Sequence, residues 1–165
     1  LVNVVGLGKF SCDIADNFSS NPQYDAYKID FDLSKTKMTR GLTSHHQLEK
    51  IEEKCPSMSY FLKKARGDSH FFLEGRDPSS AASLKVLEGM DHKSTNVFYI
   101  HPEELDLSGD IGKNENVAFH VLQEYSRSGL FKNFFISERE VTPLICSGIV
   151  MIGRSFGVTT RYFSK

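Results

Sequence analysis

The chain has almost no net charge and few cysteines, and each scarcity argues against a class of function. Its 20 lysine and arginine residues nearly balance its 21 aspartate and glutamate residues, so the chain as a whole gives no reason to expect a nucleic-acid or membrane partner. The three cysteines, Cys12, Cys55 and Cys146, are an odd number without metal-type spacing. This argues against a disulfide scaffold and a zinc site and favours the reducing cytoplasm.

Long apolar runs and targeting signals are also missing. No stretch approaches the roughly 18 apolar residues of a membrane span, and the N-terminus lacks a basic segment followed by an apolar stretch and a cleavage site. The six histidines are scattered, the pair His45-His46 lacks a third metal ligand, and no serine or cysteine lies in a nucleophile-elbow context. We therefore expect a soluble protein without a metal site and without catalytic residues that the sequence identifies.

What the chain does contain is one domain's worth of alternating strand and helix patterns. Its 165 residues are 39% apolar and 12% aromatic, enough for a core. Short apolar runs predict strands at 1–5, 27–31, 70–74, 96–100 and 131–136. Helical spacing predicts helices at 12–18, from a cap at Ser44 to Cys55, in a second piece after the interruption at Pro56 to about 65, at 78–90 and at 114–126, with residues 34–43 as a loop. The alternation predicts an α/β fold, a mostly parallel Rossmann-like sheet with helices on both faces.

In the predicted helix at 78–90, Ala81, Leu84 and Leu87 recur at three-residue spacing. We expect these three side chains to line one buried face of the helix.

The first predicted strand ends in a glycine turn. Gly6-Leu7-Gly8-Lys9-Phe10-Ser11 has two glycines of the GxGxxG pattern, and Asp30 follows near the offset at which an acidic side chain meets a ribose. This is a weak signal for a dinucleotide cofactor. A glycine turn also serves close packing of a helix on a strand, whatever the ligand.

Several strand ends together resemble the nucleotide-binding half of the FtsZ/tubulin family. Where FtsZ proteins have motifs like GxGGGGxN, NTD, LTRGLG, GGGTGTG, RP and PND, this chain has, in the same order, residues 6–13, Asp30-Phe31-Asp32, Met38-Thr39-Arg40-Gly41-Leu42, residues 74–83, His101-Pro102 and Ser137-Glu138-Arg139. The resemblance covers about residues 2–140, and Thr39-Arg40-Gly41-Leu42 is its most specific part. It implies an FtsZ/tubulin N-terminal-type domain over 1–140, followed by a segment of uncertain structure over 141–165.

The resemblance also implies a site for GTP or GDP at the strand ends. The residues that it places there are Gly6, Gly8, Lys9, Phe10, Ser11, Asp30, Arg40, Gly41, Arg76, Ser79, Ser80, Ser83 and Glu138. Family members use a second domain to supply an acidic catalytic loop to the neighbouring subunit. A chain of 165 residues has no room for that domain, so we expect no GTPase activity from it alone.

The departures from the family concentrate at the phosphate loop. Arg76-Asp77-Pro78-Ser79-Ser80 replaces the glycine-rich sequence; Pro78 removes an N–H donor, and Asp77 adds negative charge where phosphate would bind. The pair Asp77-Pro78 also fits a helix N-cap followed by proline at the first helical position. Two hypotheses follow: a degenerate domain that binds a guanine nucleotide without hydrolysing it, or a structural protein that has lost the ligand and self-associates or joins a larger assembly.

Overall fold

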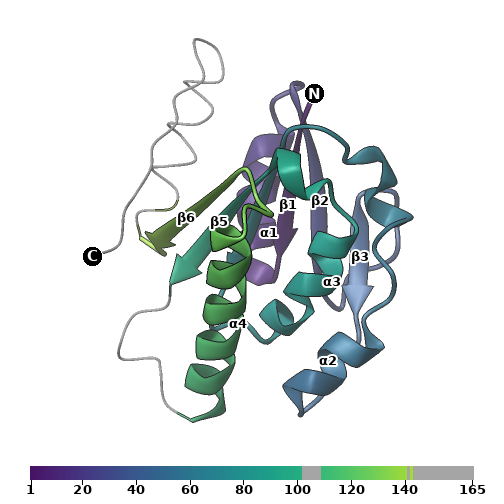
Figure 1. Cartoon of the computed structure of the whole chain (residues 1–165). Coiled ribbons are helices and arrows are strands. Elements are labelled where there is room, and N and C mark those ends of the chain that lie inside the picture. Colours follow the sequence, from purple (N-terminus) through teal and green to yellow (C-terminus); the bar gives the residue numbers. More distant parts are fainter. Residues whose placement is uncertain (102–108, 141, 143–165) are drawn as a thin grey trace.

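The computed structural model describes residues 1–101, 109–140 and 142, and within this part six strands form one fully parallel sheet (Figure 1). The strands are β1 (Val2–Leu7), β2 (Tyr24–Phe31), β3 (Thr39–Leu42), β4 (Ser69–Glu74), β5 (Thr95–His101) and β6 (Asn133–Glu138). Their order in the sheet is β3-β2-β1-β4-β5-β6, which is the order of doubly wound nucleotide-binding folds. The prediction of an α/β fold with a parallel sheet is confirmed.

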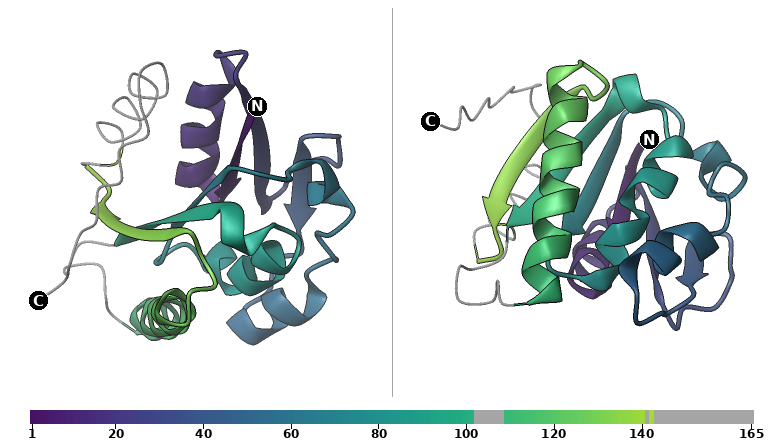
Figure 2. Two further views of the ribbon diagram at one scale, coloured as in Figure 1. Left: turned by 45° about the horizontal axis from the view of Figure 1, so that its top comes forward. Right: turned by 60° about the horizontal axis from the view of Figure 1, so that its bottom comes forward.

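Helices cover both faces of the sheet, as expected. α1 (Lys9–Ser19) lies on one face, while α2 (Leu48–Lys54), α3 (Ser83–Glu88) and α4 (Asp110–Arg127) lie on the other (Figure 2). Three 3₁₀ turns complete the described helices: η1 (Phe61–Lys64), η2 (Pro78–Ala82) and η3 (His92–Ser94). Two apolar clusters result, one beneath α1 and a larger one beneath α2, α3 and α4.

α1 packs closely on the sheet because of the glycine that ends β1. Its buried side chains include Ile14, Ala15 and Phe18, which recur at helical spacing. A Cβ added to Gly6 would lie only 2.2 Å from the carbonyl oxygen of Ser11, so no larger residue fits there. Gly6 therefore allows the helix to pack closely on the strand, which is one of the two roles that the sequence analysis gave to the glycine turn.

Three local predictions are wrong. Residues 34–43 are not all loop, because Thr39–Leu42 forms β3 and pairs in parallel with β2. Ser44 does not cap a helix, since α2 begins at Leu48 after Gln47. The helix expected at 78–90 is a 3₁₀ turn followed by six residues of α-helix.

Two rows of like side chains cross β4, β5 and β6 on the face that α1 covers. The aromatic row consists of Phe72, Phe98 and Phe135. Its rings stack with centroids 4.6 and 4.8 Å apart. The polar row consists of His70, Asn96 and Asn133. In this row the Asn96 amide donates a hydrogen bond to His70 Nδ1 over 3.2 Å. The Asn133 amide donates one to Asn96 Oδ1 over 2.8 Å.

Some predictions fall outside the described residues. These are the segment at 141–165, apart from Thr142, and Pro102 of the His101-Pro102 motif. Within the described ranges, no helix has the length and apolar character needed to cross a membrane.

Candidate functional site

The candidate site lies where the chain reverses its direction across the sheet. β1 and β4 are neighbours, but β1 leads to β2 on one side and β4 leads to β5 on the other. Crevices at the carboxyl ends of such strands are the usual ligand sites of open α/β sheets. The loop at Gly8 follows β1 and the segment 75–77 follows β4, so the two loops predicted to hold phosphate do meet at this point.

Gly8 adopts a backbone conformation that favours glycine. Its φ is +87° and its ψ 166°, and it occupies the N-cap position of α1. Its N–H donates to the carbonyl oxygen of Ile29 in β2 over 2.9 Å. That N–H is therefore engaged within the sheet and is not directed at a ligand.

Asp77 caps the segment that follows β4. Its Oδ1 accepts a hydrogen bond from the Ser79 N–H over 2.9 Å, and Pro78 occupies the first position of η2. The sequence prediction of an N-cap followed by proline is confirmed. Such a cap stabilises a helix start by about 0.5–2 kcal/mol, and here a side chain of the protein satisfies an N–H that could otherwise meet an anion.

The two loops are in contact. A Cβ added to Gly8 would lie 2.6 Å from Ser79 Oγ and 2.8 Å from both Asp77 Cγ and Asp77 Oδ2. The space beside Gly8 is thus occupied by the side chains of Asp77 and Ser79. In a phosphate-binding loop, glycine leaves such space for the oxygens of the ligand.

The negative charge of Asp77 affects the pKa of two other carboxyl groups near the contact. Burial raises the pKa of Asp30, at the end of β2, and the charge of Asp77 contributes to the increase. Burial also raises the pKa of Glu74, at the end of β4, and Asp77 again contributes. A phosphate here would approach three carboxyl groups, and like charges at short range repel.

Glu74 is the centre of an ion cluster at the same edge. Its side chain is 5% exposed, and its Oε1 lies 3.0 Å from Arg76 Nε and 3.6 Å from Arg139 Nε. The two guanidinium groups oppose the increase in its pKa that burial causes. The guanidinium of Arg139 also lies 4.5 Å from the centroid of the Phe10 ring, a cation–π contact that joins the start of α1 to the end of β6.

Two buried hydroxyls at this edge lack partners within the described part of the chain. Ser11 and Ser79 are fully buried, and neither Oγ makes a hydrogen bond. An unsatisfied buried hydroxyl costs on the order of 1–3 kcal/mol. Of all the features of the site, these two hydroxyls most strongly favour a ligand that forms hydrogen bonds there.

Arg40 and Gly41 make packing contacts in β3, at the edge of the sheet. The guanidinium of Arg40 lies 5.1 Å from the centroid of the Phe61 ring in η1. A Cβ on Gly41 would lie 2.4 Å from the carbonyl oxygen of Leu33, so glycine is required for the close approach of the loop after β2. These contacts give Arg40 and Gly41 structural roles at the sheet edge, although the buried Nε of Arg40 has no hydrogen-bond partner among the described residues.

The remaining predicted site residues are spread along the strand ends. Lys9 is exposed at the start of α1, and Ser80 and Ser83 are buried in η2 and α3. The Ser80 hydroxyl donates to the Gly75 carbonyl oxygen over 3.3 Å. Glu138 is exposed at the end of β6, and its carbonyl oxygen accepts from the Thr142 hydroxyl over 2.8 Å.

The Glu74–Arg76–Arg139 cluster is the feature that sequence reasoning missed. The sequence signal was a single acidic residue closing an otherwise apolar strand, His70-Phe71-Phe72-Leu73-Glu74, because a charge in such a position is rarely buried without a partner.

Among the described residues, no group of three or more histidine, cysteine, aspartate or glutamate side chains is arranged to hold a metal ion.

A comparison of the sequence with known protein families found no family model that matches it, and a comparison with curated proteins found no match either. The site described above is therefore interpreted from its own geometry.

Proposed function

We propose that this chain is a non-catalytic interaction domain of the FtsZ/tubulin type, in which the former phosphate site is closed by the protein's own residues. Its role is to present a rigid parallel-sheet scaffold to protein partners in an assembly. It binds no guanine nucleotide and hydrolyses none.

One observation carries the proposal. The Asp77 side chain accepts from the Ser79 N–H and at the same time lies against Gly8. The cap satisfies the helix start, brings negative charge to the anion position and fills the space beside the glycine. Each of these three effects opposes phosphate binding.

A second candidate is a domain that still binds GTP or GDP. The unpaired hydroxyls of Ser11 and Ser79 favour it, as do the basic side chains of Lys9, Arg76 and Arg139 near the same strand ends. Binding would require the Asp77 side chain to leave Gly8, which would break the cap.

The experiment compares three proteins, the wild type, Asp77→Gly and Asp68→Gly, in thermal unfolding with millimolar GTP, GDP or inorganic phosphate. A ligand that binds only the folded state raises the melting temperature. We expect no shift for the wild type and a phosphate- or nucleotide-dependent increase for Asp77→Gly. Asp68 pairs with Lys132 before β4 begins, so Asp68→Gly removes an acidic residue away from the strand carboxyl ends and should behave as the wild type does.

A nucleotide-dependent increase in the wild type would contradict the closed site and support the second candidate. In that case Ser79→Ala should reduce the increase. GTP hydrolysis by the wild type above a protein-free control would contradict both candidates.

A further inference from the structure

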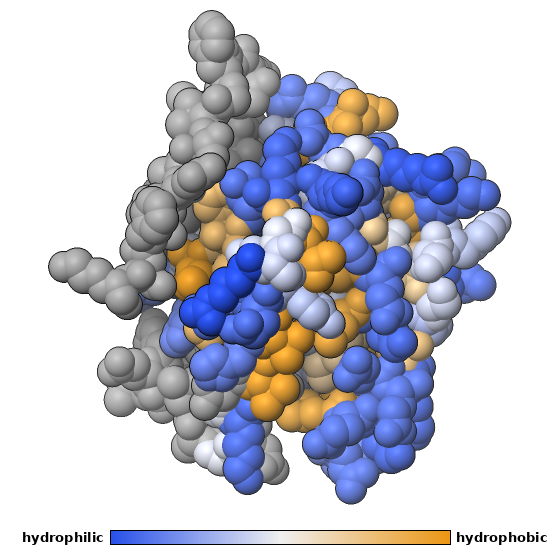
Figure 3. Space-filling view, in the orientation of Figure 1, coloured by the Kyte–Doolittle hydropathy of each residue, from blue (hydrophilic) through white to orange (hydrophobic). Residues whose placement is uncertain are grey.

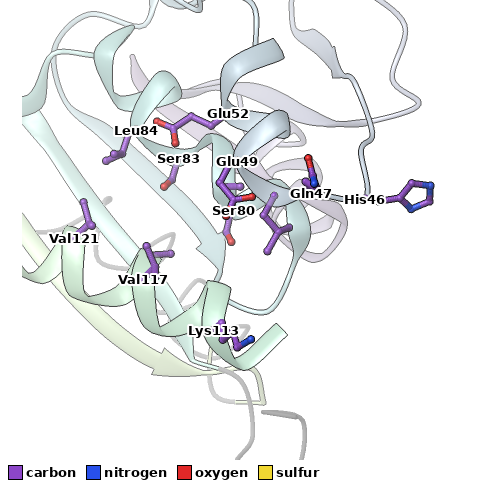
Figure 4. A pocket seen from close by; sticks show the side chains of 13 residues that line it. His46, Gln47, Glu49, Glu52, Ser80, Ser83, Leu84, Lys113, Val117 and Val121 are labelled. Carbon is purple, nitrogen blue, oxygen red and sulfur yellow. The ribbon is translucent and has the colours of Figure 1, made fainter. Parts of the chain in front are cut away.

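An open groove lies between the three helices on one face of the sheet (Figure 4). Its volume is about 340 Å³. Leu48 lines it from α2, Ala81 and Leu84 from η2 and α3, and Val117 and Val121 from α4. Its size falls at the lower end of the ligand pockets of proteins, which begin at about 300 Å³.

The walls of the groove include apolar side chains that the core buries only in part. The expectation that Ala81, Leu84 and Leu87 share a buried face is confirmed in full for Leu87, whereas Ala81 and Leu84 pack against the core but are only partly buried. Ala81 and Leu84 are left partly exposed, and Val117 is 64% exposed. Exposed apolar atoms gather on this face of the molecule, in the region between α3 and α4 (Figure 3).

Several of the residues that line the groove have small side chains. Ser80, Ala81, Ser83 and Ala118 all line it. Small residues beneath larger walls form holes that accept apolar side chains of a facing helix, as in knobs-into-holes packing.

The rim of the groove on α2 is acidic. Glu49 and Glu52 line it, and within the described residues neither carboxylate takes part in a hydrogen bond or ion pair. The neighbouring Glu53 differs, because it pairs with Lys50 over 2.6 Å. Lys113 also lines the groove, from α4, so the charged side chains that line the groove are two carboxylates and one ammonium group.

We propose that this groove docks an amphipathic helix of a partner protein, with its apolar face between α3 and α4 and lysine or arginine residues beside Glu49 and Glu52. Grooves between helices take helices whose apolar residues recur at i, i+3 or i+4, and i+7. The unpaired carboxylates select a partner with basic flanking residues and disfavour an acidic one. This inference rests on the proposed function of an interaction domain and names the class of its partner.

The test selects helical peptides from a displayed library on the folded protein. We expect the enriched sequences to share apolar residues at helical spacing and an excess of lysine and arginine. The most enriched peptide is then synthesised with a fluorescent label and titrated against the protein by anisotropy. Its affinity should fall as salt concentration rises, because the contacts to the acidic rim are screened.

Two groove variants and one control locate the binding. Val117→Lys, at an exposed position, and the double variant Glu49→Lys with Glu52→Lys should each weaken binding about tenfold or more. Glu53→Lys makes the same type of substitution once on the same helix, outside the groove lining, and should leave the affinity within about twofold. Circular dichroism confirms that each variant is folded.

Three results would overturn the proposal. They are the absence of any enriched helical sequence, enrichment of acidic peptides, and binding that is unchanged by both groove variants. Sedimentation of the protein alone gives a further outcome: a dimer that Val117→Lys dissociates would assign the groove to a second copy of the chain and refute a separate partner. None of these experiments uses a nucleotide. The docking proposal can therefore fail without affecting the thermal-unfolding test of the closed phosphate site, and the reverse is also true.

Discussion

Replacing Gly8 with alanine tests directly whether the loops after β1 and β4 are in contact. The new methyl group would lie 2.6 Å from Ser79 Oγ and 2.8 Å from Asp77 Cγ. It would also force a non-glycine residue to adopt a φ of +87°. Two separate costs follow, one from the backbone and one from crowding.

Their magnitudes can be separated with a second glycine. A non-glycine residue in a sparsely populated backbone region costs about 1–3 kcal/mol, and overpacking adds about 1–3 kcal/mol. Gly67 has a φ of +89° but no atom within 4 Å of an added Cβ, so Gly67→Ala carries a backbone cost of positive φ without the crowding. Gly8→Ala should therefore lower the free energy of unfolding by about 2 kcal/mol more than Gly67→Ala does.

Urea unfolding of the two variants measures this difference, provided that the dependence on denaturant is unchanged. Removing the Asp77 side chain should relieve part of the crowding, so Gly8→Ala should cost less in an Asp77→Gly background, with a coupling of about 0.5–3 kcal/mol. Equal costs for Gly8→Ala and Gly67→Ala, and no coupling to Asp77, would show that the space beside Gly8 is open. The reasoning for a closed site would then fail.

Two further predictions follow from buried polar groups. Ser79→Ala should raise the free energy of unfolding by up to about 1 kcal/mol because it removes an unsatisfied hydroxyl, whereas Ser80→Ala should lower it, since that hydroxyl donates to Gly75. A marked loss of stability on Ser79→Ala in urea unfolding would mean that its hydroxyl has a partner. Burial lowers the pKa of His70 to about 4 from an ordinary 6.5, so the unfolded chain takes up a proton first and stability should fall as pH drops from 6.5 toward 4, by at most about 3 kcal/mol. His70→Gln should flatten this dependence, and an NMR titration that finds His70 near its ordinary pKa would contradict it.

The sequence was informative where a signal is local or strongly periodic. The five apolar runs all overlap strands, because a parallel sheet covered on both faces needs such runs. Asp77 could be predicted as a cap, since an aspartate before a proline has few other uses at a helix start. Ser44 looked equally suitable, but its segment continues for three more residues before α2 begins at Leu48.

The sequence was uninformative where tertiary contacts decide. β3 is four residues long, at the sheet edge, and contains Gly41, so its composition is that of a loop. The partner of Arg40 is an aromatic ring about twenty residues later in the chain, and Glu74 pairs with Arg139 from a different strand end. Pairings over such separations have no local pattern, which is why the candidate site could be placed at the strand ends but not recognised as closed.

The aromatic and polar rows across β4, β5 and β6 bear on how the chain avoids mispaired sheets during folding. A slip of one residue would move every side chain of a strand to the opposite face of the sheet, where it would meet a different apolar cluster. A slip of two residues keeps the faces, and alternation alone does not oppose it. Here it would place Phe72 opposite Asn96 or Ile100 and separate His70 from Asn96. The rows therefore make even-numbered misalignments costly as well, so that three neighbouring strands have one alignment in which the phenyl rings stack on one another and the polar side chains bond to one another.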